Sequence, residues 1–232
     1  MRLKLKLITF DYGDTLVTAD PPYLTRIWMA LKDLGIKKSQ KEVERAYHIA
    51  DFKVAKRLLE EKNFNPKLHQ MLLGKTLLEE LGIKENQQEL LTELAEWLLG
   101  FRPEGVIVPG ADKVLEELKS RNYILGIISN NDGRTHQKCQ EVGIEKYFDF
   151  ILDSTIEGMI KPDPKFFQKA LELGKANPSE TLHIGDLWGS DVLGARASGL
   201  WAVWVENEHI SPHLQEKVFK IKNIEQVLEL IE

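Results

Sequence analysis

Residues 181–206 read TLHIGDLWGSDVLGARASGLWAVWVE, and this stretch decides the fold. It begins with an apolar run at 181–185, continues with helical spacing over 189–198 and ends with a second apolar run at 201–206. Strands that alternate with helices in this way indicate parallel pairing, because a parallel connection needs a long crossover. The stretch therefore predicts a strand–helix–strand unit of a parallel sheet.

The same alternation extends outward through the second half of the chain. Strands and helices in turn predict an α/β fold with a doubly wound parallel sheet and helices on both faces. The pattern gives helices at 111–120, 133–142, 164–173 and 223–231, and strands at 123–129, near 148–153 and at 219–221.

The first half of the chain has a different pattern. Leucines alternate with lysines at residues 3–7 before Ile8 and Phe10, which predicts a first strand that is more buried toward its end. From about residue 21 to residue 100 the apolar spacing is helical, with no convincing strand. We therefore expect a core of residues 1–15 and 105–232 and an inserted all-helical domain of residues 16–104.

The composition is that of an ordinary globular protein, with 43% hydrophobic and 29% charged residues. A net charge of -5 gives no general positive field, so neither a nucleic acid nor a membrane surface is an expected partner. The alternating start of the chain does not resemble a signal peptide, and no apolar run approaches the roughly 18 residues that span a bilayer. With the single cysteine, Cys139, these features predict a cytoplasmic protein.

Polar residues directly after the predicted strands are the candidates for function, because ligands of such sheets bind outside the carboxyl ends of the strands. Four junctions carry them: residues 11–15, residues 129–132, Lys161 and residues 185–191. Any one junction also suits a turn, a helix cap or a solvated charge. An acid, a hydroxyl, a lysine and an acid pair at four successive strand ends predict instead a phosphate and metal site.

Asp11 suits the role of a nucleophile that attacks a phosphoryl group and forms an aspartyl-phosphate. Because both partners are anionic, a cation and fixed donors have to offset their repulsion. Asp186 and Asp191 supply the hard oxygen ligands that Mg²⁺ prefers, so Mg²⁺ is the expected cofactor. Three groups are expected to donate hydrogen bonds to the phosphate: the Ser129 hydroxyl, the Asn130 backbone N–H and the Lys161 ammonium. Lys161 is also expected to reach Asp11.

With these residues the chain is similar to the haloacid dehalogenase-like superfamily, in the subclass with a helical cap inserted after the first strand. FDYGDTL resembles its nucleophile loop, ISNND its Ser/Thr motif, IKPDPKFF its lysine motif and HIGDLWGSDVLGARASGL its acidic motif. The likeness covers the core, whereas the insert matches only in position and helical character. The resemblance implies a Rossmann-like core and a Mg²⁺-dependent hydrolase. It makes Asp11 both nucleophile and metal ligand, adds the Gly13 carbonyl and Asp186 as ligands, and lets Asp191 either ligate the ion or orient its waters.

One position departs from the pattern. Family phosphatases usually place a second Asp two residues after the nucleophile, where it protonates the leaving oxygen, and here that residue is Gly13. General acid–base help of this kind is worth ~10² to 10⁴-fold in rate. Asp14, one residue further on, either takes over this role or caps the following turn. Cap residues such as His48, Glu60 and Glu61 are further candidates for the acid.

Three hypotheses follow from the departure. The first is a phosphatase for a small phosphorylated metabolite, restricted to good leaving groups or assisted by an acid from the cap. The second is a metal-independent 2-haloacid dehalogenase, a class that also lacks the second Asp but has no use for Asp186 and Asp191. The third is a non-catalytic Mg²⁺-binding interaction module, against which the presence of Asp11, Lys161 and Asp186 argues.

In helical-cap relatives the insert closes over the pocket and selects the substrate, and the hinges here would lie near residues 15–22 and 102–105. Trp188 either walls the pocket or packs under the cap, and His183 is expected to be a core histidine with its hydrogen bonds satisfied. A monomer and a homodimer are both compatible with the sequence. The cap candidates for pocket contacts are Tyr23, Arg26, Trp28, Tyr47, Lys53 and Arg57.

Overall fold

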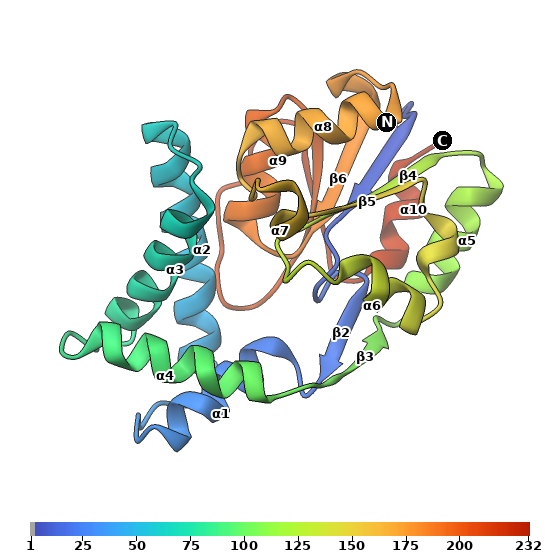
Figure 1. The fold of residues 1–232 in the computed structure, drawn as a ribbon. Helices are drawn as coiled ribbons and strands as arrows, with labels where there is room; N and C mark the ends of the chain where they lie inside the picture. Colours follow the sequence, from blue (N-terminus) through green and yellow to red (C-terminus); the bar gives the residue numbers. More distant parts are fainter. Residues whose placement is uncertain (1–2) are drawn as a thin grey trace.

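The computed structural model describes residues 3–232 and has a six-stranded parallel sheet at its centre (Figure 1). The strands lie in the order β5-β4-β1-β6-β7-β8, and every neighbouring pair is parallel. The order reverses between β1 and β6, so the predicted doubly wound sheet is confirmed. The strands are β1 (Leu7–Phe10), β4 (Ile124–Ser129), β5 (Phe150–Asp153), β6 (Thr181–Gly185), β7 (Trp201–Val205) and β8 (Val218–Ile221).

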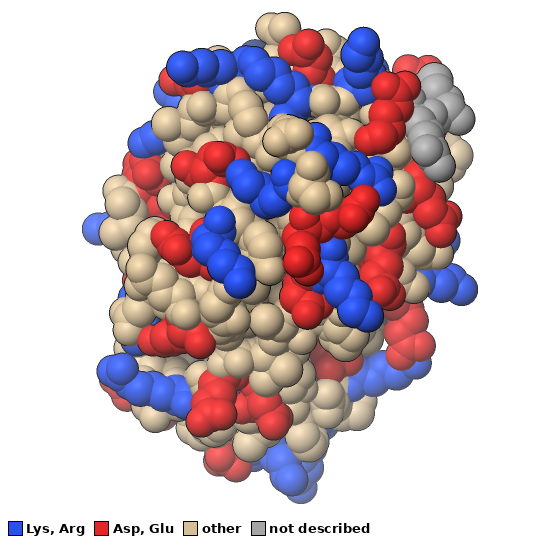
Figure 2. Space-filling model, turned by 90° about the vertical axis from the view of Figure 1, so that its right-hand side faces the viewer, with Lys and Arg blue, Asp and Glu red and all other residues tan. Residues whose placement is uncertain are grey.

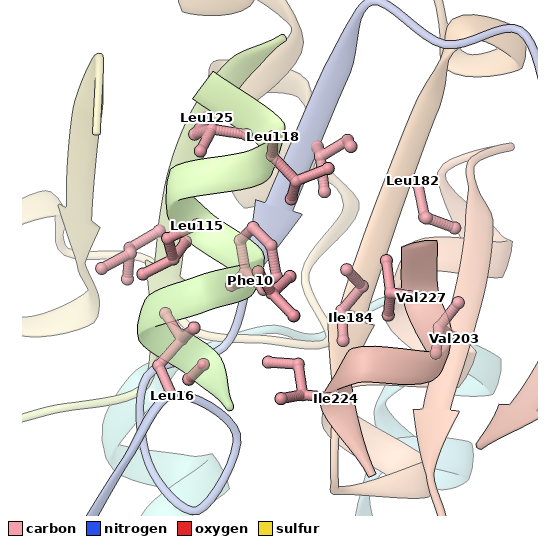
Figure 3. Packing of buried hydrophobic residues seen from close by; sticks show 14 of the residues in the cluster. Phe10, Leu16, Leu115, Leu118, Leu125, Leu182, Ile184, Val203, Ile224 and Val227 are labelled. Carbon is pink, nitrogen blue, oxygen red and sulfur yellow. The ribbon is translucent and has the colours of Figure 1, made fainter. Parts of the chain in front are cut away.

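Helices cover both faces of the sheet through two apolar clusters. Adjacent residues of a strand point to opposite faces, so β1 contributes Phe10 to one cluster and Leu7 to the other. Figure 3 shows Phe10 packed against Leu115 and Leu118 of α5 (Ala111–Ser120). Burial of such a side chain stabilises the fold by about 1.5–3 kcal/mol, which fixes the helices on the sheet. The other core helices are α6 (Thr135–Glu141), α7 (Ser154–Glu157), α8 (Pro164–Gly174), α9 (Gly194–Ala197) and α10 (Val227–Leu230).

A body of four helices, which we call the cap, is inserted between β1 and β4 and lies at one side of the sheet (Figure 1). Its helices share an apolar cluster of their own, which includes Leu31, Ala50, Leu78 and Leu94. The longest helix begins with a capping box of Ser39 and Glu42, which satisfies its free N–H groups. The cap helices are α1 (Tyr23–Asp33), α2 (Gln40–Glu61), α3 (Pro66–Glu80) and α4 (Gln87–Gly100).

An antiparallel ribbon joins the cap to the core. It consists of β2 (Val17–Asp20) and β3 (Glu104–Ile107), neither of which was predicted from the sequence. Each strand has only four residues, too few for the apolar alternation to stand out. The division into a core of 1–15 and 105–232 and a cap of 16–104 stays a prediction, and the ribbon lies at its two limits.

Three elements differ from the sequence-based expectation. The first strand begins at Leu7 and not at Leu3, which instead forms an isolated bridge to Ile231. The predicted helix at 189–198 has two parts, a π-helical segment η3 (Trp188–Leu193) and then α9. The last predicted helix is likewise divided into a 3₁₀ turn η4 (Ile224–Gln226) and α10.

The surface carries both signs of charge. On the face drawn in Figure 2, lysine and arginine side chains are interspersed with aspartate and glutamate side chains. Among residues 3–232, no helix is long and apolar enough to cross a membrane.

Candidate active site

Three predicted site residues come together because their strands are neighbours. Strand β1, which ends just before Asp11, lies between β4, which ends at Ser129, and β6, which is followed by Asp186. The backbone N–H of Asp11 donates to the carbonyl of Ile184 at 2.8 Å, which continues the pairing of β1 and β6 to the nucleophile position. Asp11 and Asp186 therefore lie where the strand order reverses, the usual ligand site of a doubly wound sheet.

Lys161 is the buried cation of this site. It follows α7, its side chain is only 1% exposed, and its Nζ donates to Asp11 Oδ1 at 2.5 Å and to Asp191 Oδ1 at 2.6 Å. A lysine is almost never fully buried unless it is paired, and here two carboxylates pair it. The structure thus brings Asp11, Lys161 and Asp191 into direct contact.

Asp191 is fully engaged by the protein. In addition to Lys161, His183 Nε2 lies 3.3 Å from Oδ1, and the backbone N–H of Leu187 donates to Oδ2 at 3.0 Å. A Cβ at Gly185 would lie 2.3 Å from the Asp191 carboxyl carbon, so glycine is required for this close approach. Because both oxygens already accept hydrogen bonds, Asp191 is better suited to holding Lys161 than to binding an ion directly.

His183 occupies the core position expected from the sequence. Its ring is buried, its Nδ1 lies 2.9 Å from Thr9 Oγ1, and burial lowers its pKa. A neutral ring with its proton on Nε2 donates to Asp191 and accepts from Thr9, which satisfies both nitrogens. His183 therefore supports the position of Asp191 from inside the sheet.

The acids of the site differ in how readily they ionise. Burial, followed by the charges of Asp11 and Asp191, raises the pKa of Asp186 well above its usual value. Burial also raises the pKa of Asp11 to about 7, although Lys161 opposes the shift. At Asp191 burial acts in the same direction, but Lys161 and His183 outweigh it and lower the pKa to about 2. One lysine therefore does not balance three acids, and full ionisation of the acids would leave an excess of negative charge at the site.

A divalent cation suits this excess. Asp11, Asp186 and Asp191 each offer one carboxylate oxygen, and these oxygens lie within 4.8 Å of one another. Mg²⁺ takes hard oxygen ligands and keeps several waters, so Asp11, Asp186 and the Gly13 carbonyl would suffice as protein ligands. The donor set fits such an ion, with Asp191 in the supporting position described above.

The raised pKa values predict how the stability of the metal-free protein depends on pH. Between the unfolded pKa of 3.8 and the folded pKa of about 7, Asp11 binds its proton in the folded protein but not in the unfolded one. The contribution of Asp11 to the free energy of unfolding therefore falls as the pH rises through this window and levels off above pH 7. Thermal melts of chelator-treated wild type and Asp11→Asn should show this as a steeper loss of Tm in the wild type. Parallel curves for the two proteins would contradict it.

Ser129 and Asn130 lie at the end of β4, next to the site. Ser129 is buried at the end of β4. The side-chain amide of Asn130 donates to the carbonyl of Lys161 at 3.0 Å and accepts from its N–H at 2.8 Å. Asn130 thus fastens the segment that carries Lys161 to the end of β4, while the substrate contact of its backbone N–H stays a prediction.

The loop after Asp11 places Gly13 and Asp14 differently. Gly13 is exposed, and a Cβ there would meet Asp11 Oδ2 only at 3.9 Å. Asp14 adopts a left-handed φ of 53°, and its Oδ1 accepts from the Thr18 hydroxyl at 2.6 Å. Burial raises the pKa of Asp14, and the hydrogen bond from Thr18, followed by the Arg26 guanidinium, partly opposes this shift. The bond to Thr18 supports the interpretation of Asp14 as a turn residue, and its catalytic role stays a prediction.

Helix α2 of the cap contacts the loop between Asp186 and Asp191 through Asp51. Asp51 accepts hydrogen bonds from Gly189 and Ser190, in the loop between Asp186 and Asp191. Burial, followed by the charges of neighbouring tyrosine and aspartate side chains, raises the pKa of Tyr47, one turn away. Asp51 was not predicted from the sequence, although a helical stripe of polar and aromatic residues was available as a signal: Glu44, Tyr47, His48 and Asp51.

His48, a candidate for the missing acid, lies at the junction of cap and core. It stacks on His209 with ring centroids 5.1 Å apart, and its Nδ1 lies 3.4 Å from Asn207 Nδ2, which also reaches the Asp186 carbonyl at 3.4 Å. Burial, followed by the charge of His209, lowers the pKa of His48 to about 4. His48 is therefore neutral near pH 7, where it is a poor proton donor.

The other cap candidates fall into two groups. Tyr23 and Arg26 are close to Tyr47: the Tyr23 and Tyr47 ring centroids are 6.1 Å apart, and the Arg26 guanidinium lies 5.4 Å from the Tyr23 ring. Trp188, which belongs to the core and not to the cap, is buried and packs edge-on against Trp204 with ring centroids 5.2 Å apart. The second group makes contacts within the cap: Trp28 with Lys38, Lys53 with Glu80, Glu60 with Lys56, and Arg57 with Glu61.

Comparisons with known proteins agree with this architecture. A family model described as haloacid dehalogenase-like hydrolase matches residues 5–199. The bovine haloacid dehalogenase-like hydrolase domain-containing protein 3 is 28% identical over 225 residues, which cover 94% of this chain and 88% of that protein. A glyceraldehyde 3-phosphate phosphatase from Pyrococcus furiosus is 34% identical over 130 residues, 54% of each chain.

Two solved structures cover nearly the whole chain. The HAD-hydrolase YfnB from Bacillus subtilis, bound to magnesium, superposes with a TM-score of 0.67 at 20% identity, and covers 98% of this chain and 99% of its own. A 2-haloacid dehalogenase from Pseudomonas syringae superposes with a TM-score of 0.57 at 29% identity and covers 97% of both chains. The first similarity shows the fold alone, because the identity is low.

Proposed function

Because the chain belongs to the haloacid dehalogenase-like hydrolase family, we propose that it is a Mg²⁺-dependent phosphatase acting on a small phosphorylated metabolite through an aspartyl-phosphate. The observation that carries the proposal is the contact of Lys161 with both Asp11 and Asp191, beside the third acid, Asp186. A cluster of three acids with one buried lysine is suited to a cation and an anionic substrate. The phosphatase name of the Pyrococcus furiosus relative supports a small phosphate ester as the substrate.

The proposed reaction begins at Asp11. Lys161 holds Oδ1, so Oδ2, on the side of Gly13, is the oxygen that attacks phosphorus. As the new O–P bond forms, the bond to the leaving alcohol breaks, and water later cleaves the aspartyl-phosphate to release phosphate. Lys161 and the Ser129 hydroxyl orient the phosphoryl oxygens. Mg²⁺ bound to Asp11 and Asp186 would neutralise charge between the nucleophile and the phosphate.

The leaving alcohol needs a proton, and the position that usually supplies it is Gly13. With His48 neutral and Asp14 bonded to Thr18, we propose that the enzyme favours leaving groups that depart without strong acid assistance. Activated aryl phosphates should therefore be hydrolysed much faster than simple alkyl phosphates.

Dehalogenation is the second candidate, favoured by the Pseudomonas syringae structure and by the missing acid at residue 13. Asp186 argues against it, because an enzyme without a cation has no use for a second carboxyl this close to its nucleophile. Release of chloride from 2-chloropropionate in the presence of a chelator would establish the dehalogenase instead.

The proposed function predicts hydrolysis of para-nitrophenyl phosphate that depends on Mg²⁺ and stops in excess chelator. The cation is required because Asp11 and Asp186 repel the substrate without it. Asp11→Asn serves as the control for contaminating phosphatases. No metal-dependent turnover above that control would remove the proposal, and a specific protein partner in pull-downs would then favour the interaction module.

A further inference from the structure

We propose that Asp51 of the cap is a positioning residue that organises the acidic loop, and that docking of the cap is thereby coupled to cation binding. The acidic loop is residues 186–191, with Asp186 at one end and Asp191 at the other. The cation part of this inference rests on the proposed function. The structural part, that a cap residue holds this loop in place, does not.

Asp51 makes a concentrated set of hydrogen bonds with the middle of the loop. Its Oδ2 accepts from the Gly189 N–H at 2.6 Å, and its Oδ1 accepts from the Ser190 N–H at 3.1 Å and from the Ser190 hydroxyl at 2.5 Å. Asp51 and Ser190 are 2% and 1% exposed, so water does not compete for these bonds. Hydrogen bonds to an ionised acceptor are about twice as strong as neutral ones.

The backbone of α2 also approaches the loop closely. A Cβ at Gly189 would lie 2.4 Å from the carbonyl oxygen of Asp51 and 2.7 Å from Ala55 Cβ. The absence of a side chain at residue 189 therefore lets the helix rest directly on the loop. Shape and hydrogen bonding thus identify the same contact between cap and core.

This contact fixes the segment between the two acids of the site. Gly189 and Ser190 belong to η3, whose first turn has N–H groups without partners inside the segment, and Asp51 supplies the acceptors. Asp191 follows Ser190 directly and holds Lys161, and Asp186 lies three residues before Gly189. When the cap lifts, the loop loses these acceptors, and both acids lose part of their support.

Because the coupling is thermodynamic, it works in both directions. A docked cap raises the affinity of the loop for a cation, and a bound cation favours the docked cap by the same factor. Groups that orient metal ligands typically change metal affinity by about 10- to 100-fold when they are mutated.

The first test compares Mn²⁺ binding, measured by electron paramagnetic resonance, in wild type, Asp51→Asn and Lys41→Ala. Asparagine keeps the size of Asp51, but its NH₂ group replaces one acceptor and faces donors. Lys41 is the matched control, because it also lies on α2 and forms a salt bridge to Glu208 of the core. The side chains of Lys41 and Glu208 are 71% and 72% exposed, so this bridge is not part of the buried contact. We expect Asp51→Asn to weaken Mn²⁺ binding about tenfold or more and Lys41→Ala to leave it unchanged.

The second test needs no metal. Hydrogen exchange of peptides covering residues 187–193 in the chelator-treated protein should be at least about tenfold faster in Asp51→Asn than in Lys41→Ala, because Gly189 and Ser190 lose their acceptor. Gly189→Ala, which pushes α2 away from the loop, should give the same result. Thermal melts of each variant separate this local effect from general unfolding.

The outcomes separate the two proposals. If the wild type binds no Mn²⁺, the proposed function fails, and hydrogen exchange still decides whether Asp51 organises the loop. If Asp51→Asn binds Mn²⁺ and exchanges the loop amides as the wild type does, within twofold, the inference is wrong.

Discussion

Asp11→Asn is expected to lower metal-dependent phosphate ester hydrolysis by about 10³-fold or more, while the metal-free variant unfolds at the same or a higher temperature than the wild type. The loss of activity follows from the loss of the attacking oxygen. Stability should not fall, because burial makes the ionised Asp11 unfavourable near neutral pH and raises its pKa to about 7. The neutral amide removes a charge that the fold holds at a cost, and Lys161 keeps its bond to Asp191.

The measurement pairs steady-state kinetics on an aryl phosphate with thermal melts in chelator above pH 7.5. Intact-mass spectrometry of acid-quenched reactions should also detect a phosphorylated wild type and no phosphorylated variant. Asp33→Asn, an exposed acid on α1, is a suitable control and should change neither quantity much. Turnover of Asp11→Asn within tenfold of the wild type would exclude Asp11 as the nucleophile. A large fall in Tm would show that the acid is structural.

The sheet could be predicted because each strand and helix leaves a local pattern. The helix at 111–120 and the strand at 181–185 match α5 and β6 residue for residue. Their apolar residues face the sheet or lie within it, and such contacts recur with the period of the element itself. The strand at 3–10 was less well predicted, because Lys4 and Lys6 keep the alternation going before the paired strand begins at Leu7.

The site followed from topology as much as from residue type. In a parallel sheet the carboxyl ends of all strands lie at one edge, so residues after β1, β4 and β6 had to be near one another. The sequence could not tell that Lys161 bonds to Asp191 as well as to Asp11, or that the oxygens of Asp191 are fully used. Those contacts depend on the exact position of each side chain, which the pattern of residue types along the chain does not specify.

The contacts between cap and core could not be predicted from the sequence. Asp51 is 138 residues from Gly189, and a polar residue inside a charged helix normally faces water. The π-helical segment was missed for the same reason, because it lies against this distant helix. The available signal for this contact was a stripe of polar and aromatic residues along α2: Glu44, Tyr47, His48 and Asp51. A search for apolar periodicity does not detect such a stripe.

Gly13→Asp is expected to raise the turnover of alkyl phosphates by about 10²-fold, because it restores an acid where the leaving oxygen departs. The position accepts a side chain. Gly13 is exposed, its φ is not in the left-handed region, and the nearest atom to an added Cβ is Asp11 Oδ2 at 3.9 Å. The gain should be much smaller for para-nitrophenyl phosphate, whose leaving group hardly needs a proton.

Gly13→Asn is the matched control, because it fills the same space without a titratable proton and should give no gain. Asp14→Asn decides the role of Asp14. If that residue already supplies the proton from its place beside Thr18, its loss will lower alkyl phosphate turnover, and Gly13→Asp will add little to the wild type. If Asp14 only shapes the turn, Asp14→Asn will affect aryl and alkyl phosphates alike, and Gly13→Asp will still increase alkyl phosphate hydrolysis in the Asp14→Asn background. An unchanged ratio of alkyl to aryl rates in Gly13→Asp would mean that proton donation does not limit this enzyme.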